Sequence, residues 1–460
     1  MRTLIHPYPP APFPSKKGKG SVFFNILTPF PLLKGKGLGI GVILAFVFCL
    51  CSVSAFSEER FPRPEFESSY AAPVYQHPLS RGTAMEYADT AVLIITLLLA
   101  SYFSLKRRSR RGLFLVMAFS LAYFGFYRHG CICPVGSIQN VASAFFDNTY
   151  SIPITVVLFF LLPIVTTLFF GRSFCASVCP LGAAQDIVAV RPVAVPKPLA
   201  RALSLIPYLY LGAAIIFAAT GASYLICRFD PFVSFFRLSG DVWRLSLGGI
   251  FLLLAVFVAR PYCRFLCPYG AILNLVSRVS IFRVTITPTD CIKCRRCENA
   301  CPFDAIETPV TEDVKKPSAR QRIILAAVFP VSMAIFAVGA SGLTSFTAGM
   351  HSKVSLARQI DREERAGAKM TYESRTYRSL GASLDDLANE AASIERRFAV
   401  MMPIAGALFG LAVAVLLFSL AYLRPRNDYE PNRGNCVSCG RCFAYCPRYY
   451  RPKAASIKEN

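Results

Sequence analysis

Residues 290–302 read DCIKCRRCENACP, and residues 435–447 read NCVSCGRCFAYCP. The first run spaces its cysteines as C-x2-C-x2-C-x3-C-P, at Cys291, Cys294, Cys297 and Cys301. The second run repeats this spacing with Cys436, Cys439, Cys442 and Cys446. Three thiols two residues apart can surround one small volume, while the proline turns the fourth thiol away from it. The two runs are therefore expected to build one structure together, although more than 130 residues separate them.

This spacing is that of a bacterial ferredoxin half, whose cysteine thiolates hold [4Fe–4S] clusters. Because the fourth cysteine of each half serves the other half, the ligation is crossed. Cys446 is expected to complete the cluster of Cys291, Cys294 and Cys297. Cys301 is expected to complete that of Cys436, Cys439 and Cys442. Zinc is the alternative, but structural zinc sites use two separated cysteine pairs, which fits this pattern poorly.

Composition places the rest of the chain in a membrane. Of the 460 residues 54% are hydrophobic and 17% are charged, and several apolar runs approach the ~20 residues that span a bilayer. The net charge of +23 is assigned to membrane orientation, with no nucleic-acid partner expected. Most of the 17 cysteines fall in clusters, unlike a secreted disulfide framework. Clusters need reduced thiols, so the ferredoxin module is expected in the cytoplasm.

The expected fold is an all-α polytopic membrane protein with about seven or eight transmembrane helices and a small cytoplasmic 2×[4Fe–4S] module. After a signal-like segment or anchor helix at 37–56, spans are expected at 86–104, 112–127, 152–170, 203–226, 246–262, 322–346 and 399–422. The parts between them are a basic N-terminus at 1–36, an outer segment at 57–85, a cysteine-containing bundle at 86–262, a first ferredoxin loop at 263–321, an outer helical hairpin or linker at 347–398, and a second ferredoxin half at 423–460. Counting crossings from the ferredoxin run places the basic residues 106–111 inside, which agrees with the positive-inside rule.

Seven further cysteines lie beside the expected span ends. On the inner side two C-x3-C-P-x-G-A motifs provide Cys175, Cys179, Cys263 and Cys267, and a helix is expected to start after each. On the outer side are Cys131, Cys133 and Cys227, with His129 as the nearest candidate for a fourth ligand. These residues are candidate ligands of one or two further iron–sulfur clusters, because electron transfer across ~30 Å of hydrocarbon needs intermediate carriers. The alternatives are structural thiols inside and a disulfide outside.

With these motifs the chain resembles polyferredoxin-type membrane iron–sulfur proteins, over roughly residues 86–450. That group includes the nitrous-oxide reductase regulator or electron-donor protein and the membrane quinol-dehydrogenase subunit of periplasmic nitrate reductase. The resemblance implies a multi-pass protein of the bacterial cytoplasmic membrane, embedded in lipid. It also implies a quinol or cytosolic ferredoxin or flavodoxin as donor, and a periplasmic flavoprotein or reductase as acceptor. Residues 57–85 are too few for the outer flavin domain of the regulator protein.

The function expected from these observations is electron transfer across the cytoplasmic membrane, as a component of an oxidoreductase system. No catalytic residue is expected, since the chain has no phosphate-binding loop, dinucleotide fingerprint or nucleophile triad. Two alternatives stay open: a redox-sensing regulator or maturation factor for a periplasmic reductase, and a component of a redox-driven ion pump. Gly406 and Gly410 form a G-x-x-x-G pair, which is expected to pack against another helix.

Overall fold

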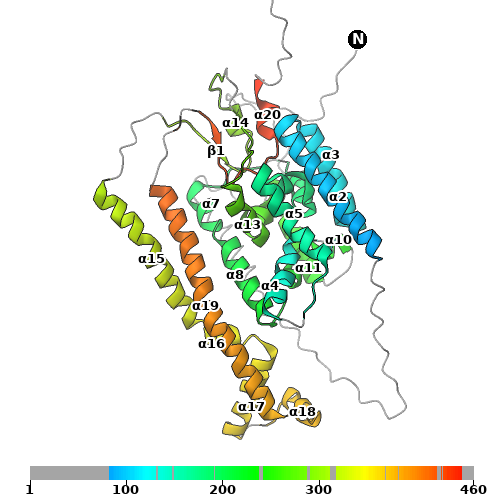
Figure 1. The fold of residues 1–460 in the computed structure, drawn as a ribbon, viewed down its shortest axis with the longest axis vertical. Helices are drawn as coiled ribbons and strands as arrows, with labels where there is room; N and C mark the ends of the chain where they lie inside the picture. The colour runs from blue at the N-terminus through cyan, green and yellow to red at the C-terminus, as the bar shows by residue number, and fades with distance from the viewer. Residues whose placement is uncertain are drawn as a thin grey trace, which may run out of the picture. The chain divides into compact units, whose positions relative to one another are not determined.

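The computed structural model describes residues 82–130, 133–147, 150–190, 192–237, 242–286, 291–310, 318–367, 369–381, 383–421, 426 and 428–447. The chain divides into two compact units, Met1–Pro73 and Val74–Asn460, and every described residue lies in the second. The segments expected at 1–36 and 37–56 lie outside the described residues, as does Cys131. The described part is almost entirely helical (Figure 1).

Four helical segments are long and apolar enough to cross a membrane: Thr83–Lys106, Lys197–Ala219, Ile323–Gly342 and Leu384–Leu420. Ile154–Phe170 and Val242–Phe257 are shorter apolar helices. Large apolar side chains on these helices face outward, as Leu253 and Val338 do with exposed fractions of 65% and 72%. A surface of this kind is stable against lipid but not against water. The chain is therefore a membrane protein.

The first helices form a bundle around α5 (Ile154–Phe170). This helix packs against α2 (Thr83–Ser101), α4 (Pro134–Phe146) and α13 (Pro268–Ser277), and α4 also packs against α8 (Ile206–Ala219). Buried Leu97 and Phe159 belong to the core of this bundle. The remaining elements here are η2 (Tyr102–Lys106), α3 (Arg110–Ser120), η3 (Leu121–Tyr127), η4 (Phe174–Val178), α6 (Pro180–Val188), α7 (Lys197–Leu203), α9 (Leu225–Phe229), α10 (Val233–Arg237), α11 (Val242–Phe257) and α12 (Pro261–Phe265).

Two predicted spans end earlier than the hydropathy pattern suggested. The span expected to reach 226 ends at Ala219, because the Thr220 hydroxyl donates to the carbonyls of Ile216 and Phe217 and Gly221 has a left-handed φ of 74°. The span expected to reach 262 ends at Phe257, and Pro261 starts the separate helix α12. The segment expected at 112–127 is helical from Arg110 to Tyr127, and its last seven residues form the π-helix η3.

A helical hairpin forms the later part of the described chain. Its arms are α15 (Ala319–Gly342) and α19 (Leu384–Ala421), which lie side by side, and α19 also contacts α8. Gly406 and Gly410 lie at the hairpin contact: a Cβ on Gly406 would be 2.3 Å from the Phe336 carbonyl oxygen. The Ser332 hydroxyl donates to the Gly410 carbonyl at 2.8 Å. The expectation of small-residue packing is thus confirmed for this pair.

The segment between the arms is helical and packs on α19. It consists of α16 (Thr344–Ala348), α17 (Ser352–Ala366) and α18 (Tyr372–Ser379). Val354 of α17 is buried against Phe398, and the ion pairs Lys353–Glu390 and Arg358–Glu395 join the two helices. The last span was expected to begin at 399. The helix that contains it begins earlier, at Leu384. Its first turns lie outside the apolar stretch and are stabilised by these polar partners.

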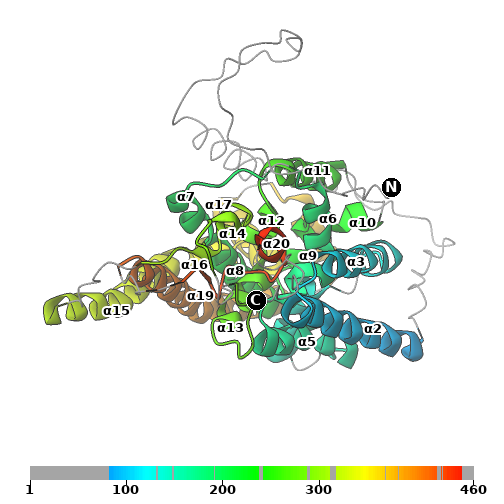
Figure 2. The ribbon, with the colours of Figure 1, turned by 90° about the horizontal axis from the view of Figure 1, so that it is seen from above.

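The two cysteine runs meet at one end of the bundle. α14 (Arg296–Asn299) of the first run contacts α20 (Arg441–Tyr445) of the second, and α20 contacts α3 (Figures 1 and 2). The strands β1 (Ile306–Glu307) and β2 (Glu430–Pro431) pair antiparallel, with Ile306 opposite Pro431. These contacts join segments that are separated in sequence by the whole hairpin.

We expect Gly410→Leu to destabilise the hairpin. The new Cβ would lie 2.5 Å from the Ser332 carbonyl oxygen, so α15 and α19 must separate and lose their packing. Overpacking of this kind costs about 1–3 kcal/mol. A lower thermal unfolding midpoint in detergent micelles would measure it. Gly339→Leu is the matched control, because a Cβ at Gly339 meets no atom within 4 Å. Equal losses in the two variants would contradict close packing at Gly410.

Candidate iron–sulfur sites

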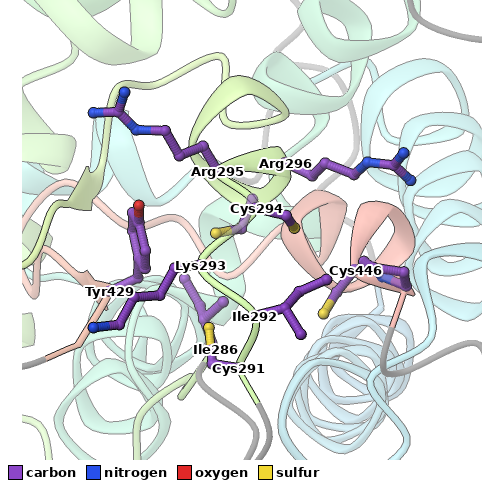
Figure 3. Close-up of a pocket in the computed structure, with 11 residues that line it drawn as sticks. Ile286, Cys291, Ile292, Lys293, Cys294, Arg295, Arg296, Tyr429 and Cys446 are labelled. Atoms are coloured by element: carbon purple, nitrogen blue, oxygen red, sulfur yellow. The ribbon is translucent and has the colours of Figure 1, made fainter.

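The first cysteine run opens onto a pocket that the second run completes. Four cysteines line this pocket: Cys291, Cys294, Cys297 and Cys446 (Figure 3). Ile286 and Tyr429 form part of its wall. Cys446 follows directly after α20, and the contact between α20 and α14 brings it to the loop of the first run. The structure thus gathers the four cysteines for which the sequence predicted one cluster.

The remaining four ferredoxin-type cysteines gather in a second place. Cys301, Cys436 and Cys439 pack around a small core of Phe303, Ala305 and Val437. The thiols of Cys436 and Cys442 both lie close enough to those of Cys301 and Cys439 for their charges to interact. Cys301 accepts from the Ala305 N–H at 3.4 Å. This is the second group that crossed ligation predicted.

The donor type at these sites fits iron–sulfur ligation, because cysteine sulfur is the ligand that such clusters use. Burial raises the pKa of Cys436 to about 12, although the Ser438 N–H opposes the shift. A free thiol at this position would stay protonated at neutral pH, and ligation to iron would replace its proton. In the described part of the chain no three Cys, His, Asp or Glu side chains converge on a single ion. In a [4Fe–4S] cluster each thiolate instead binds its own iron.

The two C-x3-C-P motifs form a third group. Each motif lies on a short helical turn, η4 or α12, that follows an apolar helix. Cys179 and Cys267 are the N-cap residues of α6 and α13, and a proline follows each at the first helical position, so the predicted helix starts are confirmed. The thiols of Cys179 and Cys267 interact electrostatically with those of Cys175 and Cys263.

The glycine of each C-P-x-G element allows this close approach. A Cβ on Gly182 would lie 3.3 Å from the Cys175 carbonyl oxygen, and one on Gly270 would lie 3.3 Å from the Cys263 carbonyl oxygen. Both contacts are tight, so a larger residue would push the helix start away from its cysteine turn. The Gly270 N–H donates to the Cys267 Sγ at 3.3 Å. Such bonds stabilise a thiolate.

A fourth group lies next to the third. Cys133 is the N-cap of α4, which begins at Pro134, and its thiol interacts electrostatically with Cys227. A Cβ on Gly136 would be 3.4 Å from the Cys227 Sγ. Cys133 also interacts electrostatically with Cys179 and Cys267. His129, the candidate fourth ligand, is exposed and lines a shallow pocket with Phe126, Tyr127 and Arg128.

The sequence pattern placed these two groups in separate inner and outer layers, and the structure brings them closer together. α4, α6 and α13 have 13, 9 and 10 residues, which at 1.5 Å per residue is about 14–20 Å. Helices of this length do not cross ~30 Å of hydrocarbon. The cysteines at their starts lie within reach of one another's charge.

The membrane motifs and the second ferredoxin run are held together by one buried carboxylate. Asp186 of α6 pairs with Arg110 of α3 at 2.6 Å, with Arg441 of α20 at 3.0 Å, and with Arg260 at 3.5 Å. Burial alone would raise the pKa of Asp186, but the charges of Arg260, Arg441 and Arg110 outweigh it and hold that pKa well below its usual range. The carboxylate is therefore ionised wherever the fold is intact.

The arginines around Asp186 also bind the backbone of the cysteine motifs. Arg110 donates to the Cys439 carbonyl at 3.0 Å. Arg260 is almost fully buried and donates to the carbonyls of Cys175 and Ala176. A further arginine, Arg172, lies just before η4 and donates to the Gly434 carbonyl at 2.8 Å. Neither Asp186 nor Arg260 was among the site residues predicted from the sequence. The available signal was an acidic residue three positions after an apolar C-P-x-G-A element.

The cysteine-containing segments match known domains. Residues 112–153, 152–198 and 241–286 each match the model of a 4Fe-4S binding domain, and residues 284–307 match another model of the same description. Each of the first three stretches contains one Cys-Pro motif. The chain therefore carries 4Fe-4S binding domains in the bundle as well as in the first ferredoxin-type run.

Three curated proteins are among its relatives. YccM of Escherichia coli, named for electron transport, is 26% identical over 187 residues, which cover 37% of this chain and 52% of YccM. Protein NirI of Paracoccus denitrificans is 29% identical over 217 residues, covering 44% and 31%. Regulatory protein NosR of Stutzerimonas stutzeri is 26% identical over 216 residues, covering 44% and 29%. The chain thus spans about half of YccM and less than a third of the other two. No solved structure matches it.

We expect Asp186→Asn to destabilise the contact between the ferredoxin runs and the bundle. Three arginine charges would remain without their carboxylate, and loss of one partner from a buried ion pair costs about 3–5 kcal/mol. The measurements are thermal unfolding and amide hydrogen exchange of residues 436–447. Since the folded pKa of Asp186 lies below the unfolded value of about 3.9, the stabilisation is fully present above that pH and is lost only as pH falls further.

The matched control is Glu390→Gln, which removes an ion pair between Lys353 and Glu390 whose side chains are 52% and 54% exposed. A surface pair contributes about 0–1 kcal/mol, so little change is expected. Comparable losses in Asp186→Asn and Glu390→Gln would show that the buried carboxylate has no special structural role.

Proposed function

We propose that this chain, a membrane protein similar to the polyferredoxin-type iron–sulfur proteins, carries electrons across the cytoplasmic membrane through four successive groups of cysteines. The observation that supports this most is that each group lies near the next, through a shared core for the first three groups and through electrostatic interaction for the last. Electron tunnelling falls steeply with distance, so carriers in successive contact are what such a transfer requires.

The succession can be followed residue by residue. The first group, Cys291, Cys294, Cys297 and Cys446, shares the core of Ile286 and Tyr429 with Cys301 and Cys442 of the second. The second group shares the core of Ala259 and Phe303 with Cys175 of the third. The third interacts electrostatically with Cys133 of the fourth. Every step between neighbouring groups is therefore made within one packed core or one electrostatic contact.

We assign two [4Fe–4S] clusters to the eight ferredoxin-type cysteines and a further cluster to Cys175, Cys179, Cys263 and Cys267. When bound, such clusters supply reversible one-electron chemistry over a wide range of potentials. The protein's part is to hold the thiolates, to donate backbone hydrogen bonds to them and to exclude water. Cys133 and Cys227, with Cys131 and His129 as the remaining candidates, would form the outer end.

The orientation follows from the residues around the ferredoxin runs. Arg108 lies 5.3 Å from the ring centroid of Phe443, and Arg110 contacts the Cys439 carbonyl. The basic stretch 106–111 therefore lies at the same end as the ferredoxin runs. Basic loops favour the cytoplasmic side, and cysteine thiols are kept reduced there. We assign this end to the cytoplasm and the Cys227 end to the periplasmic side.

The electron donor would be a quinol or a cytosolic carrier, and the acceptor a periplasmic flavoprotein or reductase. A second candidate function is regulation or maturation of such a reductase, and the name of NosR as a regulatory protein favours it. Electron transfer predicts that reduction at the ferredoxin runs is followed by reduction of an acceptor on the opposite side. Sensing alone predicts no such turnover.

The test is the iron and acid-labile sulfide content of the anaerobically purified protein, with EPR spectra. Two ferredoxin-type clusters and one inner cluster contain about twelve irons, and an outer cluster adds to that number. We expect Cys175→Ala/Cys263→Ala to lower the content by about four irons and to remove one EPR signal.

Cys49→Ala/Cys51→Ala is the control, since these two cysteines belong to none of the four groups. About eight irons in the unaltered protein, with no change in the Cys175/Cys263 variant, would limit the clusters to the ferredoxin runs and end the proposal of transfer through the membrane.

A further inference from the structure

The two ferredoxin-type runs have the same local backbone. At matching positions, Lys293 and Ser438 have φ of 51° and 54°, and Arg295 and Gly440 have φ of 59° and 73°. Each loop therefore makes the same turn around its cysteines. Four positions beside the cysteines correspond in the two runs and define one face of each loop: Ile292, Lys293, Arg295 and Arg296 in the first run, and Val437, Ser438, Gly440 and Arg441 in the second.

In the second run this face is covered by the bundle. Val437 and Ser438 have exposed fractions of 8% and 4%. A Cβ on Gly440 would lie 3.0 Å from the Leu113 Cδ1 of α3. Arg441 pairs with the carboxylate of Asp186 at 3.0 Å. The face thus combines an apolar centre with an arginine, and its partner surface combines apolar side chains with a buried carboxylate.

In the first run the equivalent face is open. Ile292, which matches the buried Val437, has an exposed fraction of 54%. Lys293, Arg295 and Arg296 are also exposed and surround the pocket of the first cysteine group (Figure 3). Cys294 is the exposed cysteine of that pocket. The first cysteine group is therefore accessible from outside at the same face through which the second group contacts the bundle.

The charges on this face are not needed for the turn itself. Left-handed backbone at a non-glycine residue is unfavourable, and the second run uses Gly440 where the first has Arg295. The Arg295 side chain is 67% exposed, and its ion pair is the surface contact with Glu298 at 3.5 Å. A glycine would suit the turn better, so the presence of a cation at this strained position points to a role for its charge.

We propose that the face formed by Ile292, Lys293, Arg295 and Arg296 binds an acidic, soluble one-electron carrier protein of the flavodoxin or ferredoxin type. The argument for this occupant is charge complementarity: three cations surround one exposed apolar side chain, and the equivalent face already receives a carboxylate. Opposite charges around a small apolar centre favour fast, weak association, which suits transient electron transfer. This inference rests on the proposed electron-transfer function and names its cytosolic partner.

The redox step is the transfer of one electron from the carrier to the first cysteine group. The reduced carrier loses one electron per encounter and the chain gains one at the first cysteine group, with no bond formed or broken. The carrier leaves oxidised by one electron. Release requires weak binding, and a surface of exposed charges provides this because salt screens it.

The experiment uses the full-length, cluster-containing protein in detergent micelles and reduced flavodoxin as the probe. Lys293→Glu/Arg295→Glu is expected to slow reduction by flavodoxin about tenfold or more at low ionic strength, with a smaller effect at high salt. Binding of oxidised flavodoxin, measured by titration calorimetry, should weaken in parallel. Reduction by dithionite and the iron content should not change.

Two matched variants distinguish binding at this face from a general effect of the protein's net positive charge. Lys197→Glu/Arg201→Glu makes the same charge change on α7, whose exposed Lys197 and Arg201 lie outside the pocket, and should leave the flavodoxin rate unchanged. Lys293→Arg/Arg295→Lys keeps the charge and should retain the rate. Equal losses from the two charge reversals, or no loss from Lys293→Glu/Arg295→Glu, would overturn the proposal. Association of the protein with itself through this face would overturn it as well, and light scattering would detect that.

Transfer across the membrane and the docking surface can be tested independently, and either can fail without the other. If flavodoxin reduces the first cysteine group through this face but no electron reaches an acceptor on the periplasmic side of proteoliposomes, the docking surface stands and transfer across the membrane does not. If dithionite drives transfer but flavodoxin binds with no dependence on Lys293 and Arg295, transfer stands and the docking surface does not.

Discussion

The carboxylate of Asp186 is the interaction on which the arrangement of this protein depends most. Three arginines from separate parts of the chain converge on it: Arg110 from α3, Arg260 before α12, and Arg441 from the second ferredoxin-type run. A buried guanidinium is costly unless it is paired, so each arginine is stable only when all these segments are in place. Two of these arginines also donate to backbone carbonyls: Arg110 to Cys439, and Arg260 to Cys175 and Ala176. The network therefore sets the position of the ferredoxin runs and of the bundle cysteines together.

The C-P-x-G element occurs three times, and each time it starts a helix close to another cysteine. Its cysteine is the N-cap residue of a helix, and its proline is the first residue of that helix. Its glycine leaves room for an atom of another cysteine residue. That atom is a carbonyl oxygen at Gly182 and Gly270, and a sulfur at Gly136. The helices that follow are too short to cross a membrane, so the element places cysteines inside the bundle. This is the physical reason why Cys133 lies within electrostatic reach of Cys179 and Cys267.

The two ferredoxin-type runs show how one loop shape can support two different contacts. In the second run a small residue at Gly440 permits contact with α3, and Arg441 reaches a fixed carboxylate. In the first run larger cationic residues occupy the same turn and face outward. One face joins the module to the bundle, and the other remains accessible beside the exposed Cys294. Under the proposed function, a module with one such face on each side would have separate places for electron entry and exit.

Much of this architecture follows from the sequence, because its determinants are local. The cysteine spacing identifies the two runs, Cys-Pro predicts the starts of α6 and α13, and apolar length identifies the four described helices that are long enough to cross a membrane. The G-x-x-x-G spacing of Gly406 and Gly410 is also local, and it predicts a close contact between helices. Other features needed the tertiary structure, because they depend on residues distant in the sequence. Asp186 is one acid among 27 acidic residues until Arg110, Arg260 and Arg441 surround it. The closeness of the cysteine groups to one another and the contrast between Ile292 and Val437 likewise appear only when the chain has folded, since contact and burial are properties of the packed molecule and not of the residue.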